Sequence, residues 1–315
     1  MGDLPALLRA GDLLVVNDAA TLPASLAGRS RCGVVEVRLA GVPEGGPASR
    51  GPWPAVLFGA GNWRARTEDR PPPPRLVRGD RVAFGGLLAE VVGVSGVSPR
   101  LVELVFDREG DALVAAIQRL GRPVQYSHLQ ADLEPWDVQT AYAGRPWAVE
   151  MPSAGRPLRL PLLRALHLRG VGVAAVTHAA GLSSSGDPAL DAVLPLPERS
   201  LVPANAVEAI ARTKARGGRV VAAGTTVVRA LEGRAAAGGG ELHPGPGLTD
   251  LRLGPCHERR IVDGLLTGLH EPGESHFELL QSFAPRPLLA AAVRHAAAAG
   301  YLGHEFGDSS LVLPA

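Results

Sequence analysis

Residues 217–232 read GGRVVAAGTTVVRALE, and this stretch indicates the fold class. Val220 to Ala223 form a short apolar run of the kind that makes a buried strand. Gly224 ends the run, Thr225 and Thr226 stand where hydroxyls cap a helix, and the residues that follow have helical spacing. The stretch therefore predicts a strand, a turn and a helix. The free backbone N–H groups at such a turn suit a carboxylate or a phosphate.

Helical and strand-like segments alternate over much of the remaining chain. The expected helices cover residues 111–120, 162–169, 204–216, 277–284 and 287–299, and the expected strands cover 13–16, 171–177, 260–266 and 310–313. Residues 235–240 are low in complexity and predict a flexible loop. Alternation of helices and strands is typical of an α/β domain with parallel strands.

Residues 31–106 differ from the rest of the chain because they are rich in strand-like segments and contain no expected helix. Strand-like pieces occur at 32–39, 55–57, 81–94 and 101–106, between turns rich in proline and glycine. Short strands at this spacing predict a small antiparallel barrel or sandwich. The proline run at 71–74 predicts an extended connector on its edge.

The length of 315 residues is enough for one large domain or two ordinary ones. We expect a discontinuous α/β catalytic domain made of residues 1–29 and 111–315. An inserted β-barrel domain is expected to cover residues 30–110.

The composition excludes several classes of protein. Charged residues make up 20% of the chain and the net charge is +1, which argues against non-specific coating of nucleic acid but allows a local basic patch. The two cysteines, Cys32 and Cys256, are far apart and lack metal-ligand spacing, so we expect no metal site and a reduced, cytoplasmic location. The N-terminus lacks the features of a signal peptide, and no apolar run approaches the roughly 20 residues that span a bilayer. We expect no membrane association.

Polar side chains follow most of the expected strands. Ligands of α/β domains gather at the carboxyl ends of the strands, so residues at these positions are candidate ligand contacts. The candidates found in this way are Asn17, Asp18, His178, Ser183, Ser184, Thr225, Thr226, His270, Glu271, His276, His304, Glu305 and Asp308. Each one taken alone is better explained as a helix cap or a structural polar residue. Five such clusters together favour a shared binding site.

Further segments, in a fixed order along nearly the whole chain, carry a resemblance to one family. They are GDLLVVND at 11–18, LPA at 22–24, MPSAG at 151–155, the 217–232 stretch, LTDL at 248–251, VDGLLTGLHEP at 262–272 and FGD at 306–308. The chain resembles the S-adenosylmethionine:tRNA ribosyltransferase-isomerases of queuosine biosynthesis. The resemblance implies a barrel-like α/β domain with an inserted small antiparallel β-barrel.

The resemblance also implies a reaction. The sulfonium of S-adenosylmethionine acidifies the hydrogens on the adjacent ribose carbon, and a base removes one of them. The ribosyl group is then transferred to the 7-aminomethyl-7-deazaguanine base of tRNA and rearranged, with release of adenine and methionine. Such chemistry needs a base, an acid and hydrogen bonds to the ribose, but no metal and no redox cofactor.

Roles for individual residues follow from the resemblance. His270 is the first choice for proton transfer, followed by His178 and Asp308. The residues expected to hold S-adenosylmethionine are Asn17, Asp18, Thr225, Thr226 and Arg229, with the methionine carboxylate at the helix start. The other expected binding residues are Ser153, Gly155, Arg156, Ser183, Ser184, Thr249, Asp250, Glu271, His276, His304 and Glu305.

The chain departs from the family pattern near the expected site. The family sequence PTAGLHF reads PSAGRPL at 152–158, which loses a histidine and gains Arg156. New functional groups at such positions indicate a rebuilt pocket. Two alternatives therefore stay open: a paralogue that uses S-adenosylmethionine with a small-molecule or nucleobase acceptor, and a non-catalytic tRNA- or nucleoside-binding paralogue.

One segment is the best candidate for a tRNA contact. It contains Arg64, Arg66, Arg70, Arg75, Arg78 and Arg81, with Trp63 beside them for base stacking. A solvated, arginine-rich surface is the alternative interpretation. The sequence does not indicate an oligomeric state.

Overall fold

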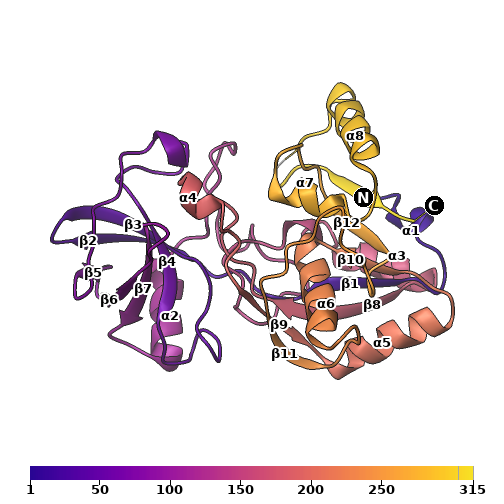
Figure 1. Ribbon diagram of the computed structural model, residues 1–315, viewed down its shortest axis with the longest axis horizontal. Coiled ribbons are helices and arrows are strands. Elements are labelled where there is room, and N and C mark those ends of the chain that lie inside the picture. Colours follow the sequence, from indigo (N-terminus) through magenta and orange to yellow (C-terminus); the bar gives the residue numbers. More distant parts are fainter. Residues whose placement is uncertain (304, 315) are drawn as a thin grey trace.

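Two β structures of different kind make up the chain, and they lie at opposite ends of the computed structural model in Figure 1. The structure describes residues 1–303 and 305–314. One β structure is an open sheet of seven strands covered by helices. The other is a closed antiparallel barrel of six strands.

The open sheet has the strand order β11-β9-β8-β1-β10-β12-β13. Its strands are β1 (Leu13–Asn17), β8 (Gly172–His178), β9 (Glu198–Val202), β10 (Val220–Ala223), β11 (Gly245–Thr249), β12 (Gly264–Gly268) and β13 (Ser309–Val312). The four central strands, β8, β1, β10 and β12, are parallel. The others, β9, β11 and β13, pair in antiparallel fashion. Since β11 and β13 are free edges, the expected barrel-like form of this domain is wrong, although its α/β class is confirmed.

Helices cover both faces of the sheet, which explains why β1 is buried along its whole length. Alternate residues of β1 point to opposite faces. Leu14 and Val16 pack with residues of α1 (Leu4–Leu7) and α3 (Leu160–Leu168). Leu13 and Val15 belong to a larger core with residues of α5 (Ala204–Ala215), α6 (Thr225–Ala237), α7 (Ser275–Leu280) and α8 (Arg286–Ala298).

The barrel closes in the order β2-β3-β4-β7-β6-β5, with β5 pairing back to β2. Its strands are β2 (Ser25–Ser30), β3 (Gly33–Leu39), β4 (Trp53–Phe58), β5 (Arg81–Ala83), β6 (Leu88–Val94) and β7 (Leu101–Phe106). Trp53 and Phe106 meet edge to face inside it, with ring centroids 6.1 Å apart. Helix α2 (Gly110–Leu120) buries Leu113 and Ile117 in the same core, and the short helix α4 (Pro188–Asp191) contributes Leu190. The antiparallel barrel expected from the sequence is confirmed.

Several element boundaries differ from the sequence-based expectations. Strand β12 begins at Gly264 rather than at residue 260, because the buried Glu232 carboxylate accepts the backbone N–H groups of residues 260–262 at 2.9–3.0 Å. Ala235 to Ala237 continue α6 instead of forming a loop, consistent with the high helix propensity of alanine. Strands β2, β9 and β11 were not expected. The division of the chain into domains stays a prediction, and the first barrel strand already begins at Ser25.

Residues 121–152 return from the barrel to the sheet without a long regular element. They are tied down by isolated bridges between Thr21 and Ala148 and between Ser25 and Arg122. In the described part of the chain, no helix is both long enough and apolar enough to cross a membrane.

Candidate functional site

The carboxyl ends of the central strands meet at the side chain of Asn17. Its Oδ1 accepts hydrogen bonds from the backbone N–H groups of Ala19 and His178, at 3.1 and 2.9 Å. Its Nδ2 donates to the carbonyl of His178 at 3.0 Å and lies 3.4 Å from the hydroxyl of Thr226. Asn17 is buried, and its hydrogen bonds join the ends of β1 and β8 to the start of α6.

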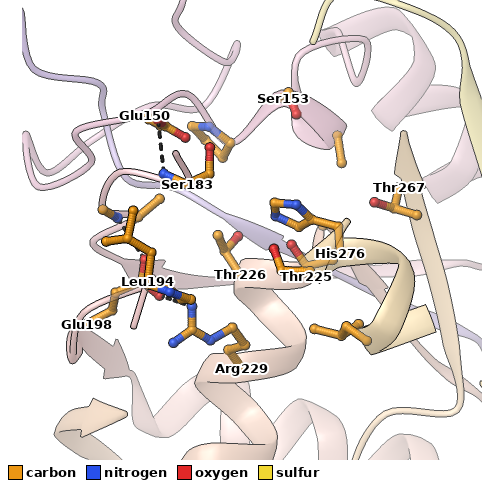
Figure 2. A pocket seen from close by; sticks show the side chains of 18 of the residues that line it. Glu150, Ser153, Ser183, Leu194, Glu198, Thr225, Thr226, Arg229, Thr267 and His276 are labelled. Carbon is orange, nitrogen blue, oxygen red and sulfur yellow. Dashed lines mark hydrogen bonds and ion pairs between the residues drawn. The ribbon is translucent and has the colours of Figure 1, made fainter. Parts of the chain in front are cut away.

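A cavity of about 220 Å³ lies at this edge of the sheet (Figure 2). Its walls come from distant parts of the sequence: segments 150–154, 180–183 and 224–229, and the residues that follow β12. The polar residues that line it include Glu150, Ser153, Ser183, Glu198, Thr225, Thr226, Arg229, Thr267, His270, His276 and Glu305. A concave site with polar groups on an otherwise apolar wall is the usual form of a small-molecule site.

Helix α6 begins at the wall of this cavity. Gly224 precedes it with φ of +98°, a conformation that side-chain-bearing residues rarely adopt. Gly224 is the N-cap and no side chain caps the helix, so the expectation that Thr225 and Thr226 cap it is wrong. Both threonines belong to the first turn and line the cavity. The N–H groups of the first helical residues have no i−4 acceptor. Among those of Thr225 to Val227, only the Val227 N–H reaches the Gly224 carbonyl, at 3.2 Å. The N–H groups of Thr225 and Thr226 therefore offer donors, and this end of α6 offers a positive partial charge, to a ligand.

A buried cluster of charged and polar groups joins α6, β9 and β8 at one end of the cavity (Figure 2). Arg229 Nη1 lies 2.5 Å from Glu198 Oε2. Glu198 Oε1 accepts the N–H of Gly181 at 2.7 Å, and Glu198 Oε2 lies 3.4 Å from His178 Nε2. Burial raises the pKa of Glu198, while the Arg229 charge and the Gly181 N–H oppose that shift. Burial and the Arg229 charge lower the pKa of His178 to about 3, so its imidazole stays neutral.

Two stacked histidines form another part of the wall. The rings of His270, which follows β12, and His276, in α7, have centroids 4.8 Å apart and an interplanar angle of 16°. His270 Nε2 lies 2.9 Å from the Thr267 hydroxyl, and its Nδ1 lies 3.7 Å from Glu274 Oε2. Burial and the His270 charge lower the pKa of His276 to about 4. His276 therefore enters the cavity as a neutral imidazole that can donate one hydrogen bond and accept another.

Several titratable cavity residues were absent from the sequence-based candidates, among them Glu150 and Tyr126. Glu150 Oε1 accepts the N–H of Ser183 at 3.2 Å. Burial and the charge of Glu305 raise the pKa of Glu150 to about 7. Burial also raises the pKa of Tyr126 well above its usual range. Both residues lie in the irregular connection, where no strand end marks them, although Glu150 directly precedes the MPSAG segment.

A family model described as "Queuosine biosynthesis protein" matches residues 1–312. The chain belongs to this family. The S-adenosylmethionine:tRNA ribosyltransferase-isomerase of Anaeromyxobacter dehalogenans is 38% identical over 319 residues, covering 99% of this chain and 87% of the relative. The protein with the same name from Synechococcus elongatus is 36% identical over 322 residues, covering 99% and 84%. The resemblance inferred from the sequence is therefore confirmed.

A solved structure, S-adenosylmethionine tRNA ribosyltransferase from Thermotoga maritima, is also similar to this member of the queuosine biosynthesis family. It is 25% identical and the match covers 99% of this chain and 86% of that one. The TM-score of the two structures is 0.49.

Some residues that the family resemblance suggested do not line the cavity. They are Asn17, Asp18, Gly155, Arg156, His178, Ser184, Thr249, Asp250, Glu271 and Asp308. His304 lies outside the described residues. Those that do line it are Ser153, Ser183, Thr225, Thr226, Arg229, His270, His276 and Glu305.

Structural contacts account for several of the residues outside the cavity. Asp308 is exposed, and its Oδ2 accepts the N–H of Leu302 at 2.9 Å, which closes a turn. Asp18 Oδ1 accepts the hydroxyl of Thr177 at 2.6 Å. His178 is fully buried beside Glu198.

Structural contacts also account for three further residues that lie outside the cavity. The Thr249 hydroxyl accepts the N–H of Leu251 at 3.1 Å. Arg156 lies over the ring of Phe306, 4.7 Å from its centroid. A Cβ on Gly155 would lie 2.4 Å from the Tyr142 hydroxyl, so no larger residue fits there without a shift.

Most of the expected basic segment is neutralised by ion pairs. Arg70 is buried and pairs with Glu36 at 2.5 Å. The remaining pairs are Arg64 with Asp132, Arg66 with Glu68 and Arg81 with Glu90, at 3.6, 2.5 and 3.5 Å. Arg75 and Arg78 are exposed, line a groove on the barrel, and have no ion pair within the described residues. Within residues 1–303 and 305–314, no group of three His, Cys, Asp or Glu residues is placed to hold a metal ion.

Proposed function

We propose that this protein is an S-adenosylmethionine:tRNA ribosyltransferase-isomerase. It transfers the ribosyl group of S-adenosylmethionine to a 7-aminomethyl-7-deazaguanine base in tRNA, rearranges that group, and releases adenine and methionine. Family membership and relatives of this name at 36–38% identity over nearly the whole chain support the proposal. The main structural support is the cavity at the strand ends. The start of α6, Arg229 of the same helix and the neutral imidazole of His276 all line it.

The start of α6 is the proposed binding site for the methionine carboxylate. The helix offers first-turn N–H groups and the hydroxyls of Thr225 and Thr226 at the cavity wall. Arg229 adds a positive charge one turn further along, although Glu198 already pairs with it. A carboxylate at this place therefore binds mainly through the helix end, with Arg229 as a weaker, indirect contributor.

His270 and His276 are the proposed contacts for the nucleoside part of the substrate. His270 retains its role as a candidate for proton transfer, because its ring is oriented by Thr267 and lies against the cavity. His178 instead has a positioning role in the proposal. Its imidazole is neutral and buried next to Glu198, so it helps to position the carboxylate that pairs with Arg229.

Two arginines of the barrel are the proposed phosphate contacts. Arg75 and Arg78 lie on an exposed groove without ion pairs in the described part of the chain, whereas Arg70 is part of the barrel structure. The sulfonium of the substrate supplies the activation in the proposed reaction, so the reaction calls for no metal or redox cofactor. A cytoplasmic location is part of the same proposal, since tRNA is the acceptor.

Titration calorimetry with S-adenosylmethionine tests the substrate assignment. The wild-type protein should bind it, and Thr226→Val should weaken the binding by roughly tenfold, since one hydrogen bond to a charged group contributes about 1.5 kcal/mol. Thr213→Val, the same change on the distant helix α5, is the matched control and should not change the affinity. If the wild-type protein does not bind S-adenosylmethionine, the proposed function is contradicted.

A further inference from the structure

Glu150 is held in place from two sides. Its backbone N–H and that of Val149 donate to the Ala180 carbonyl, at 3.3 and 2.7 Å. Its side-chain Oε1 accepts the N–H of Ser183 at 3.2 Å. The carboxyl group thus lines the cavity at a defined position, and Figure 2 shows it beside Ser183 at the end opposite Glu198 and Arg229.

No ion pair neutralises this carboxyl within the described residues, because the nearest charged groups are engaged elsewhere or carry the same sign. Arg38 of β3 acts on Glu150 from the barrel side, but its Nε pairs with Glu36 at 2.6 Å. Glu305 repels it from the C-terminal segment, and the neutral phenol of Tyr126 lies on the connecting segment. Arg229 and His276 line the same cavity from α6 and α7.

We propose that Glu150 is a catalytic residue that transfers protons within this cavity, a role that rests on the function proposed above. The ionised carboxylate takes a proton from the ribose carbon beside the sulfonium: an O–H bond forms, the C–H bond breaks, and its electron pair stays on carbon. The protonated carboxyl then returns that proton to adenine. As the glycosidic C–N bond breaks, its electron pair passes to the adenine nitrogen and the ring oxygen forms a C=O bond to the anomeric carbon. The other C–O bond of the ring breaks in the same step, and the electron pair on the deprotonated carbon forms a C=C bond to the ring carbon released from oxygen.

The pKa values of Glu150 and His276 support this assignment. A group that both takes and gives a proton works best when its pKa is close to the working pH. Burial and the charge of Glu305 raise the pKa of Glu150 to about 7, whereas burial lowers the pKa of His276 to about 4. Glu150 therefore changes its charge near neutral pH, and His276 does not.

The test is single-turnover release of adenine from S-adenosylmethionine in the presence of tRNA that carries the aminomethyl-deazaguanine base. Glu150→Gln should lower the rate by at least about 100-fold, the usual contribution of general acid–base catalysis, while its affinity for S-adenosylmethionine stays within about threefold of wild type. Glu208→Gln, the same change on the exposed face of α5, is the control and should be fully active. Glu305→Gln should move the pKa of the rate profile downward, because the charge that repels the Glu150 carboxylate is gone.

The results separate this inference from the proposed function. A Glu150→Gln variant that releases adenine at a rate within about threefold of an active wild-type enzyme would overturn the role of Glu150 alone. A rate profile that Glu305→Gln leaves unmoved would also contradict it. A wild-type protein that neither binds S-adenosylmethionine nor releases adenine would contradict the proposed function. The role of Glu150 would then be contradicted as well, because it depends on that function.

Discussion

The guanidinium of Arg229 and the carboxylate of Glu198 form an ion pair, with Nη1 and Oε2 2.5 Å apart, and their side chains are only 10% and 6% exposed. The pair connects helix α6 to strand β9 at one end of the cavity. Its partners on the carboxylate side are the Gly181 N–H and the ring of His178.

Removal of one member of this pair should be costly, because the other charge stays buried without a partner. Glu198→Ala should lower the free energy of unfolding by about 3–5 kcal/mol, measured by urea denaturation. The matched control is Glu208→Ala, which breaks an exposed pair with Arg212 and should change stability by less than about 0.5 kcal/mol. Equal effects of the two substitutions would contradict a structural role for the pair.

Asn17→Ala should also destabilise the protein. The substitution leaves the N–H groups of His178 and Ala19 without their Asn17 acceptor and removes one of the two donors to the His178 carbonyl, which also accepts the Ala180 N–H. We expect a loss of about 2–3 kcal/mol in chemical denaturation. Asn17→Asp keeps the acceptor oxygen and should lose less stability at high pH. A neutral effect of Asn17→Ala would contradict this structural role.

Gly155→Ala tests whether the family glycine is needed for packing. Its new Cβ would lie 2.4 Å from the Tyr142 hydroxyl and 3.5 Å from the ring carbon that bears it. We expect a loss of about 1–3 kcal/mol in thermal or urea unfolding. Tyr142→Phe removes the clashing oxygen, so the double variant should regain much of that loss relative to Gly155→Ala. If the double variant is no more stable than the single one, the clash is not the cause.

The neutral His178 should make the protein less stable in acid. Its pKa is about 3 in the folded protein and near 6.5 in the unfolded chain, so the unfolded state binds the extra proton. The stabilisation is complete above about pH 6.5 and decreases as the pH falls towards 3. Between pH 7 and pH 5, His178→Gln should show a loss of unfolding free energy about 2 kcal/mol smaller than wild type. Identical pH dependences would mean that His178 reaches solvent.

The exposed barrel arginines should set the salt dependence of tRNA binding. Arg75→Ala with Arg78→Ala should weaken binding and reduce the slope of log affinity against log salt by roughly one for each arginine. Arg66→Ala is the control, because Arg66 already pairs with Glu68. An unchanged slope in the double variant would place the tRNA contact elsewhere.

The sequence predicted the parts of the fold that depend on local pattern. The run Val220 to Ala223 is β10 with the expected bounds, and the strand end at Asn17 does meet the ends of its neighbours. Strand β2 was missed because its sequence, SLAGRS, has little strand character. Its Gly28 is needed since a Cβ there would lie 2.6 Å from Phe84, and such a packing constraint cannot be read from the sequence.

The site was predicted less completely, for a physical reason. The strand-end rule and the family resemblance found Thr225, Thr226 and His276, because each lies near a recognisable strand or motif. Glu198 was missed with its strand β9. Glu150 lies on an irregular segment, and its proximity to Glu305 arises only when residues far apart in sequence fold together.

The most direct test of the account is to incubate the purified protein with S-adenosylmethionine, with and without tRNA that carries the aminomethyl-deazaguanine base. Mass spectrometry then follows adenine, methionine and the mass of the modified nucleoside. We expect release of adenine and methionine only with the tRNA, together with a matching gain of mass on the RNA. Release without tRNA would indicate another acceptor, and no release in either reaction would contradict the proposed activity.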